Sequence, residues 1–192
     1  MDHDGSEGYE SIADDFVAAR SDIGADVIRA WSRRHIPDAG SVLDIGCGSG
    51  LPITQAVVNE GFNAYGVDAT ASLVQKFRTN LPQTPIACER FQDSDFFHRQ
   101  FDAIISIGLI FLLKPDDQAL LIRKSSAALT SGGRMIFSAP KQICEWTDIL
   151  SGRRSRSLGE IAYATLIADA DMTLVKCLAD DWDNNYFDIS KP

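Results

Sequence analysis

Apolar residues recur with two different periods along this chain. From Ser11 to Trp31 they recur at roughly helical spacing, and Gly24 divides this stretch into two predicted helices. After Pro37 and Gly40 the pattern changes to short, nearly continuous apolar runs, which are typical of strands buried on both faces of a parallel sheet. Five such strands are predicted, over residues 41–45, 63–67, 85–88, 101–107 and 132–138.

Helices are predicted between and after these strands. One begins at Pro115, with Asp116 and Asp117 in its first turn, where the helix dipole favours acidic side chains. Another begins where Ser157 and Glu160, three residues apart, form a predicted capping box. The other two predicted helices cover residues 51–59 and 71–80, with Pro52 in a first turn.

The end of the chain predicts a pair of strands, 172–178 and 185–189, separated by the acidic turn 179–183. The turn is too short for a crossover helix, so the two strands should pair antiparallel. The alternation of strands and helices before them indicates a doubly wound, Rossmann-like α/β sheet. We expect a single domain overall, in which residues 1–36 form a helical extension and residues 37–192 form the sheet.

Composition narrows the class of protein. The formal net charge of −9 disfavours a nucleic-acid partner unless a local basic patch compensates. The four cysteines form no Cys-x-x-Cys pair and no histidines show metal-ligand spacing, so we expect reduced thiols and no metal. No apolar run reaches the ~18 residues of a membrane span, and the acidic N-terminus does not resemble a secretion signal. These features favour a soluble, cytoplasmic protein.

A glycine-rich loop follows the first strand, with the spacing Gly46-x-Gly48-x-Gly50. Glycines at this position let the backbone turn tightly and approach a ligand closely. Dinucleotide-binding enzymes prefer Gly-x-Gly-x-x-Gly, whereas Leu51 and Pro52 follow Gly50 here. The spacing therefore disfavours a nicotinamide cofactor, and a tight structural turn without a ligand remains an alternative.

Two acidic residues accompany this loop. Asp44 lies inside the end of the first strand, where an unpaired carboxylate is costly, so it should bond to loop amides or to the ammonium group of a ligand. Asp68 closes the second strand about 20 residues after the loop, where an acid meets the ribose hydroxyls of an adenosine cofactor. As an alternative or in addition, Asp68 caps the next helix.

These segments resemble the motifs of the class I S-adenosylmethionine-dependent methyltransferases. Val42–Gly50 resembles the first motif and Gly66-Val-Asp68 the next, while Phe101–Ile105 and Leu129–Ile136 resemble the fourth and fifth strands. The resemblance covers about residues 41–138. It implies a seven-stranded sheet of order 3-2-1-4-5-7-6 with the seventh strand antiparallel, and an N-terminal helical lid over the cofactor.

The resemblance also implies contacts to S-adenosylmethionine, whose product is S-adenosylhomocysteine. The segment Cys88–Phe91 would supply the edge of the adenine pocket; Glu89 is favoured there over Arg90, although many relatives have Gly-Asp at this point. Arg20 and Tyr9 are candidates for lid contacts, and Arg20 could reach the cofactor carboxylate. The complete implied set is Arg20, Asp44, Gly46, Cys47 and Gly48, then Asp68, Ala69, Glu89, Phe91, Ile107 and Gly108.

The sequence defines the part of the site that would bind the methyl acceptor less well. The apolar segment 108–113 fits core packing or an apolar acceptor pocket, and the long connection 139–156 is of a kind that is often functional. Arg153, Arg154 and Arg156 in that connection are either a solvated face or a clamp for a carboxylate or phosphate. The predicted acceptor-binding residues are Phe111, Trp146, Arg153, Asn185 and Tyr186.

Methyl transfer from a sulfonium is an in-line displacement that needs alignment but no covalent nucleophile. A base is required only for a protonated oxygen or nitrogen, and Asp148, Asp181 and Tyr186 are the weak candidates. The leading hypothesis is a methyltransferase for a small-molecule acceptor, acting as a monomer or homodimer. The alternatives are a non-catalytic cofactor- or partner-binding module, a methyltransferase for protein or RNA, and a nicotinamide-dependent oxidoreductase.

Overall fold

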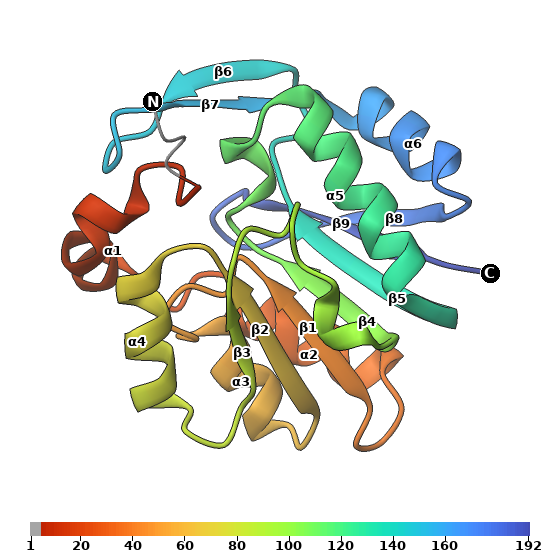
Figure 1. Ribbon diagram of the computed structural model, residues 1–192. Coiled ribbons are helices and arrows are strands. Elements are labelled where there is room, and N and C mark those ends of the chain that lie inside the picture. The colour runs from red at the N-terminus through yellow and green to blue at the C-terminus, as the bar shows by residue number, and fades with distance from the viewer. Residues whose placement is uncertain (1–4) are drawn as a thin grey trace.

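The computed structural model describes residues 5–192 around a central seven-stranded sheet (Figure 1). The strand order is β3-β2-β1-β4-β5-β9-β8, and β9 is antiparallel to both of its neighbours. This confirms the predicted doubly wound order, with β8 and β9 as the sixth and seventh strands. The strands are β1 Ser41–Ile45, β2 Asn63–Asp68, β3 Ile86–Cys88, β4 Phe101–Ser106, β5 Leu129–Ser138, β8 Thr173–Ala179 and β9 Asn185–Ser190.

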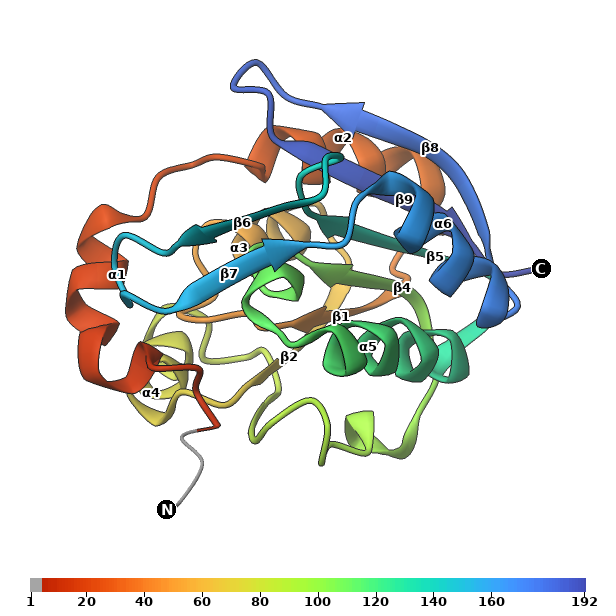
Figure 2. The ribbon, with the colours of Figure 1, turned by 90° about the horizontal axis from the view of Figure 1, so that it is seen from above.

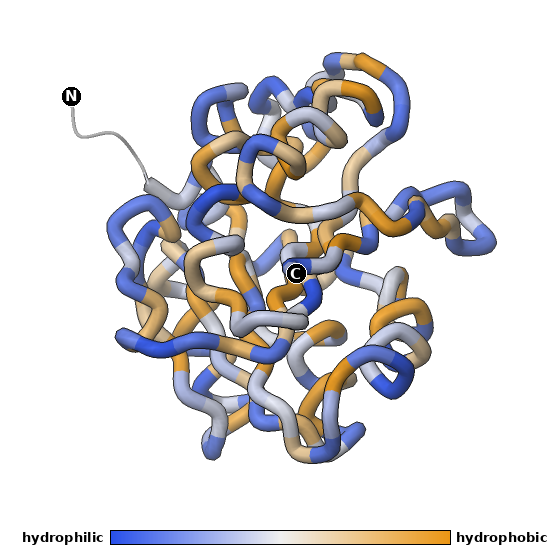
Figure 3. Tube along the Cα trace, turned by 90° about the vertical axis from the view of Figure 1, so that its right-hand side faces the viewer, coloured by the Kyte–Doolittle hydropathy of each residue, from blue (hydrophilic) through white to orange (hydrophobic). Residues whose placement is uncertain are grey.

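The central strands are buried because helices cover both faces of the sheet. In β4 every residue is buried except Asp102, which is half-buried and accepts hydrogen bonds from the backbone N–H and the hydroxyl of Ser41 at 2.7 and 2.9 Å. These bonds join the beginnings of β1 and β4. Hydrophobic segments accordingly run through the interior in Figure 3, and hydrophilic segments occupy the outer loops.

Each face of the sheet has its own hydrophobic core. Helices α2 (Ala25–His35) and α3 (Ile53–Asn59) pack on one face, and α5 (Pro115–Ala128) and α6 (Glu160–Asp169) pack on the other, as α5 does in front of the sheet in Figure 1. Helix α4 (Ala71–Asn80) packs beside β2 and β3. The remaining helical elements are short: η1 Tyr9–Ile12, α1 Ala13–Ala19, η2 Phe96–His98 and η3 Ile110–Leu112.

Helix α2 is bonded to the sheet through a buried carboxylate. The indole N–H of Trp31 donates to Asp188 Oδ1 over 2.8 Å, and Arg134 Nη2 donates to the same oxygen over 2.6 Å. Asp188 and the Trp31 ring are both buried. The helical extension therefore has two parts with different surroundings: α2 covers the sheet, whereas η1 and α1 lie beside α4 and the hairpin described next.

Two of the sequence-based expectations for residues 139–160 were wrong. The expected long connection contains a hairpin, β6 (Cys144–Thr147) with β7 (Arg154–Ser157), which lies next to α1 (Figure 2). The capping box does not form, because Ser157 belongs to β7 and its hydroxyl donates to the carbonyl of Pro140 at 2.6 Å. Helix α6 begins instead after Gly159, without a side-chain cap.

Three further observations concern residues 5–192. None of the helices in this range has the length and apolar character to cross a membrane. The same residues contain no cluster of histidine, cysteine, aspartate or glutamate that could hold a metal ion. All four cysteines are free thiols, and Cys47 is buried within the glycine loop.

Candidate functional site

A cavity of about 260 Å³ lies over the carboxyl ends of β1, β2 and β4. The glycine loop and the residues after β2, β3 and β4 form its floor, while the N-terminal segment and the β6–β7 turn cover it. This is the edge at which a doubly wound sheet binds ligands. The cavity brings together all of the residues predicted to contact the cofactor, namely Arg20, Asp44, Gly46, Cys47, Gly48, Asp68, Ala69, Glu89, Phe91, Ile107 and Gly108.

The glycine loop needs glycine for two physical reasons. Gly46 has a φ of +78°, a left-handed conformation that side chains rarely adopt, and its backbone N–H donates to the carbonyl of Val67 at 2.8 Å. A Cβ at Gly46 would also lie 3.0 Å from the side chain of Leu109. The loop thus turns at the end of β1, and its backbone faces the cavity with no side chain at this position.

Asp68 holds the loop in place. Its Oδ2 accepts a hydrogen bond from the Gly48 N–H, and its Oδ1 accepts one from the Thr70 N–H, each at 2.8 Å. Burial raises the pKa of Asp68, and these two amide bonds oppose the increase. The residue at the cap position of α4 is Thr70, so Asp68 is not the helix cap that was considered as an alternative. Each carboxylate oxygen retains a lone pair for a ligand hydroxyl.

Asp44 is a nearly inaccessible carboxylate at the end of β1. Its side chain is 3% exposed, and Thr54 Oγ1 donates a hydrogen bond to Oδ2 at 2.7 Å. Burial raises the pKa of Asp44 to about 7, although the Thr54 bond and the charge of Arg20 lower it in part. A cationic group that entered the cavity beside Asp44 would favour the ionised form of this carboxyl group over the protonated form.

Arg20 enters the cavity from the end of α1. Its guanidinium lies within electrostatic range of Asp44, Tyr9 and Tyr186, and 5.8 Å from the centre of the Phe16 ring. Burial lowers the pKa of Arg20, and the charge of Asp44 opposes that change. One wall of the cavity therefore carries a cation and an anion close together.

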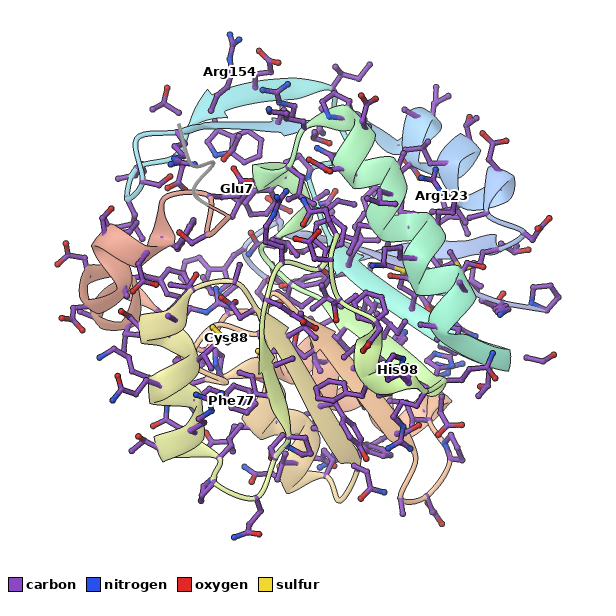
Figure 4. The ribbon with its side chains drawn as sticks, in the orientation of Figure 1. Glu7, Phe77, Cys88, His98, Arg123 and Arg154 are labelled. Carbon is purple, nitrogen blue, oxygen red and sulfur yellow. The ribbon has the colours of Figure 1, made fainter. Side chains whose placement is uncertain are left out.

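The N-terminal segment is held over the cavity by contacts at both ends. Asp14 pairs with Lys76 of α4 at 2.8 Å, and the carboxylate of Glu10 accepts hydrogen bonds from the hydroxyl and the backbone N–H of Ser72. At the other end, Glu7 lies 3.6 Å from Arg153 of the hairpin. Figure 4 shows Glu7 beneath the hairpin, so the segment bridges α4 and the β6–β7 turn.

Glu89 and Arg90, between which the sequence left a choice, both line the cavity. The backbone N–H of Glu89 donates to the carbonyl of Asp68 at 3.0 Å, which fixes this residue beside the end of β2. The stem of Arg90 packs against Gly5, where an added Cβ would lie 2.6 Å from Arg90 Cδ. Arg90 thus contacts the covering segment as well as the cavity.

The residues predicted for the acceptor end separate in the structure. Phe111 and Asp148 line the cavity, and the Trp146 ring packs against Phe111 with ring centres 5.3 Å apart. Tyr186 is buried behind Arg20 and donates its hydroxyl proton to Asp180 Oδ2 at 2.8 Å, outside the residues that line the cavity. Asn185 and Asp181 lie at the β8–β9 turn, also outside this lining.

The hairpin arginines do not converge into a clamp. Arg153 faces Glu7 at the N-terminal segment, whereas Arg154 pairs with Glu145 across the hairpin at 3.0 Å. Figure 4 shows Arg154 pointing away from the molecule. Arg153 precedes β7, which begins at Arg154, and none of the three arginines is among the residues that line the cavity. Of the two alternatives for these arginines, this geometry favours the solvated face over the clamp.

Several lining residues had no signal in the sequence. Phe16 and Leu150 contribute apolar surface from α1 and from the hairpin turn, and Leu73 contributes it from α4. Phe16 also packs edge-to-face on Tyr9, with ring centres 5.2 Å apart. Each of these residues is ordinary in its local sequence, and Leu150 could not be told from its apolar neighbour Ile149, which is exposed.

Comparisons with known proteins find sequence similarity to methyltransferases. The family model described as "Methyltransferase domain" matches residues 42–133. Among curated proteins, the S-adenosylmethionine-dependent methyltransferase UmaA of Mycobacterium tuberculosis is 28% identical over 111 residues, which are 56% of this chain and 39% of that protein. A ribosomal protein L11 methyltransferase of Neisseria gonorrhoeae is 29% identical over 108 residues, 56% of this chain and 35% of its own. The chain thus spans less than half the length of either relative.

Solved structures show the same fold over almost the whole chain. A magnesium protoporphyrin IX methyltransferase from Synechocystis PCC 6803 with bound S-adenosylmethionine has a TM-score of 0.76 at 14% identity, covering 100% of this chain and 99% of its own. An S-adenosylmethionine-dependent methyltransferase from Clostridium acetobutylicum has a TM-score of 0.72 at 14% identity, with coverages of 95% and 97%. Residues 42–133 are thus similar to a methyltransferase domain, and the whole chain shares its fold and strand order with solved S-adenosylmethionine-dependent methyltransferases.

Proposed function

We propose that this chain binds S-adenosylmethionine in the cavity and transfers its methyl group to a small-molecule acceptor. The observation that carries the proposal is the convergence of the glycine loop with Asp44 and Asp68 in one cavity at the carboxyl edge of the sheet. A nicotinamide cofactor is less compatible with this loop, because Leu51 stands where the pattern Gly-x-Gly-x-x-Gly has its third glycine.

The residues present fit the cofactor group by group. Asp44, buried with one hydrogen bond to Thr54, suits an ammonium group, and the neighbouring Arg20 suits a carboxylate. Asp68 is fixed by two amide bonds and suits the ribose hydroxyls. The apolar residues Ala69, Leu73 and Phe91 suit the adenine ring, with Glu89 at its edge.

The chemistry needs alignment more than it needs acid or base groups. When bound, the cofactor supplies a methyl group that is already activated by the sulfonium. The protein would fix the direction of approach through Ile107 and Gly108, which follow β4, and would exclude water with the N-terminal segment and the hairpin. Alignment of this kind can supply roughly 7–11 kcal/mol of the barrier reduction. Residues 5–20 act in this proposal as a lid.

A protein acceptor is the second candidate, because several curated relatives are ribosomal protein L11 methyltransferases. A small molecule is favoured for this chain because the cavity is covered from two sides, by η1 and α1 and by the β6–β7 turn. A peptide segment would have to displace one of these covers. The net charge of −9 also disfavours an RNA acceptor.

Isothermal titration with S-adenosylhomocysteine, S-adenosylmethionine and NAD tests the cofactor. We expect binding of the first two and none of NAD. Asp68→Ala should weaken binding about 10- to 100-fold, the value of hydrogen bonds to a charged group, whereas Asp169→Ala, an exposed acid on α6, should leave it unchanged. Absence of binding at high micromolar cofactor, or tighter binding of NAD, would contradict the proposal.

A further inference from the structure

The cover of the cavity carries polar and aromatic groups that the proposed cofactor contacts do not use. Tyr9 of η1 and Asp148 of the hairpin turn line the cavity from this side, and Phe111 of η3 lines it from the segment after β4. Tyr9 and Asp148 lie within electrostatic range of each other, although they are far apart in the sequence. Because all of the proposed cofactor contacts except Arg20 lie on the floor, this side is where an acceptor would meet the protein.

Asp148 is held in one orientation by the hairpin turn itself. Its Oδ1 accepts hydrogen bonds from the backbone N–H and the hydroxyl of Ser151, at 2.7 and 2.6 Å. Within residues 5–192 no lysine, arginine or histidine forms an ion pair with it. The carboxylate is therefore preorganised, with its Oδ2 outside these two bonds.

The charges that line the cavity leave Asp148 as an uncompensated anion. Glu7 faces Arg153, while Asp44 and Arg20 suit the two charged ends of the cofactor's amino-acid group. When bound, the cofactor would add one positive charge through its sulfonium, against several lining acids. In full, the lining acids are Glu7, Asp44, Asp68, Glu89 and Asp148, and the lining bases are Arg20 and Arg90.

Aromatic rings surround this part of the cavity. The ring centre of Tyr9 lies 5.2 Å from that of Phe16, and the ring centre of Phe111 lies 5.3 Å from that of Trp146, so each of these cavity-lining rings packs against a second ring. A carboxylate among aromatic faces is a favourable environment for a cationic nitrogen, through charge pairing and cation–π attraction. It is unfavourable for an anionic acceptor.

We propose that the acceptor is an amine carried on an apolar or aromatic body, and that Asp148 binds its nitrogen. This inference rests on the proposed function. Before the transfer the bound ammonium group releases one proton to water, which leaves a neutral amine. Its lone pair then forms the new N–C bond while the C–S bond breaks and its electron pair stays on sulfur. The methylated nitrogen carries the positive charge next to Asp148.

Other acceptor classes fit these residues less well. A hydroxyl is neutral, so it gains no charge pairing with Asp148, and it must lose its proton during attack. Burial, aided by the charge of Asp148, raises the pKa of Tyr9 to about 12, so its phenol stays protonated. A carboxylate acceptor would be repelled by Asp148. An ammonium group gains a charge partner in Asp148, and only its surplus proton has to leave before the transfer.

Three probes test this assignment: phenethylamine, 2-phenylethanol and phenylacetate. Each carries a phenyl ring on a two-carbon chain, and they differ in the terminal group. Each is titrated into the full chain saturated with S-adenosylhomocysteine. We expect the amine to bind at least 10-fold more tightly than the alcohol, and the carboxylate to bind most weakly. In Asp148→Asn the amide oxygen can keep both bonds from Ser151, so the fold of the turn is retained. The preference for the amine should then fall below about threefold.

Glu145→Gln is the matched control. It removes one negative charge from the same hairpin, but Glu145 lies outside the cavity lining and pairs with Arg154. The control should keep the preference for the amine. An amine that binds no better than the alcohol, or a preference that survives in Asp148→Asn, would overturn the assignment. If the unaltered chain does not bind S-adenosylhomocysteine, the proposed function is contradicted, and the assignment of an amine acceptor is contradicted with it.

Discussion

The buried carboxylate of Asp44 gives the most direct prediction, because it couples stability, pH and cofactor binding. Its pKa is raised from 3.8 to about 7, chiefly by burial. Between these two values the native protein holds a proton that the unfolded chain has released. The free energy of unfolding should therefore fall as pH rises from about 4 to 7, and should change no further above that. The total corresponds to about 4 kcal/mol.

Asp44→Asn removes this dependence, because an amide is neutral throughout and can still accept the bond from Thr54. We expect the ligand-free variant to gain stability relative to the unaltered chain by about 3 kcal/mol between pH 5 and pH 8. Urea unfolding at both pH values, followed by tryptophan fluorescence, measures this difference. Asp169→Asn, on the exposed side of α6, should show no such change.

The same substitution should weaken S-adenosylhomocysteine binding about 10-fold or more at pH 8, since the ammonium group loses its charged partner. In the unaltered chain, affinity should rise about 10-fold from pH 6 to pH 8 as Asp44 ionises. Titration calorimetry of both proteins gives these values. A stability difference that changes by less than about 1 kcal/mol, together with pH-independent binding, would refute the reasoning.

The remaining predictions concern single contacts. Gly46→Ala should lower the free energy of unfolding by about 1–3 kcal/mol, since it places a Cβ at a φ of +78° and 3.0 Å from Leu109; urea unfolding that shows no loss would contradict this. Trp31→Phe removes the donor at 2.8 Å from Asp188 and should cost about 1–3 kcal/mol in the same assay. Trp146→Ala should loosen the hairpin from η3 and speed trypsin cleavage at its arginines, and an unchanged cleavage rate would show that this ring does not hold the hairpin.

The sequence by itself determined the sheet and the floor of the cavity. The apolar run of β4 and the alternation of strands with helices predict a parallel sheet, because only strands covered on both faces can be apolar throughout. Asp44, Gly46 and Asp68 could be identified because each lies at a strand end within a short local motif. Their meeting then follows from the topology alone, since the carboxyl ends of neighbouring parallel strands share one edge.

Only the tertiary structure decided the cover of the cavity. The hairpin was missed because β6 and β7 consist mainly of polar residues and therefore show no apolar pattern of a buried strand. The two strands are held together by their antiparallel backbone pairing. Arg153 and Arg154 separate because Arg153, in the turn before β7, faces Glu7, whereas Arg154 pairs with Glu145 across the hairpin. Tyr9 and Asp148 meet across more than a hundred residues. Such contacts are set by packing between distant elements, whereas local spacing encodes only what neighbours in the chain can do.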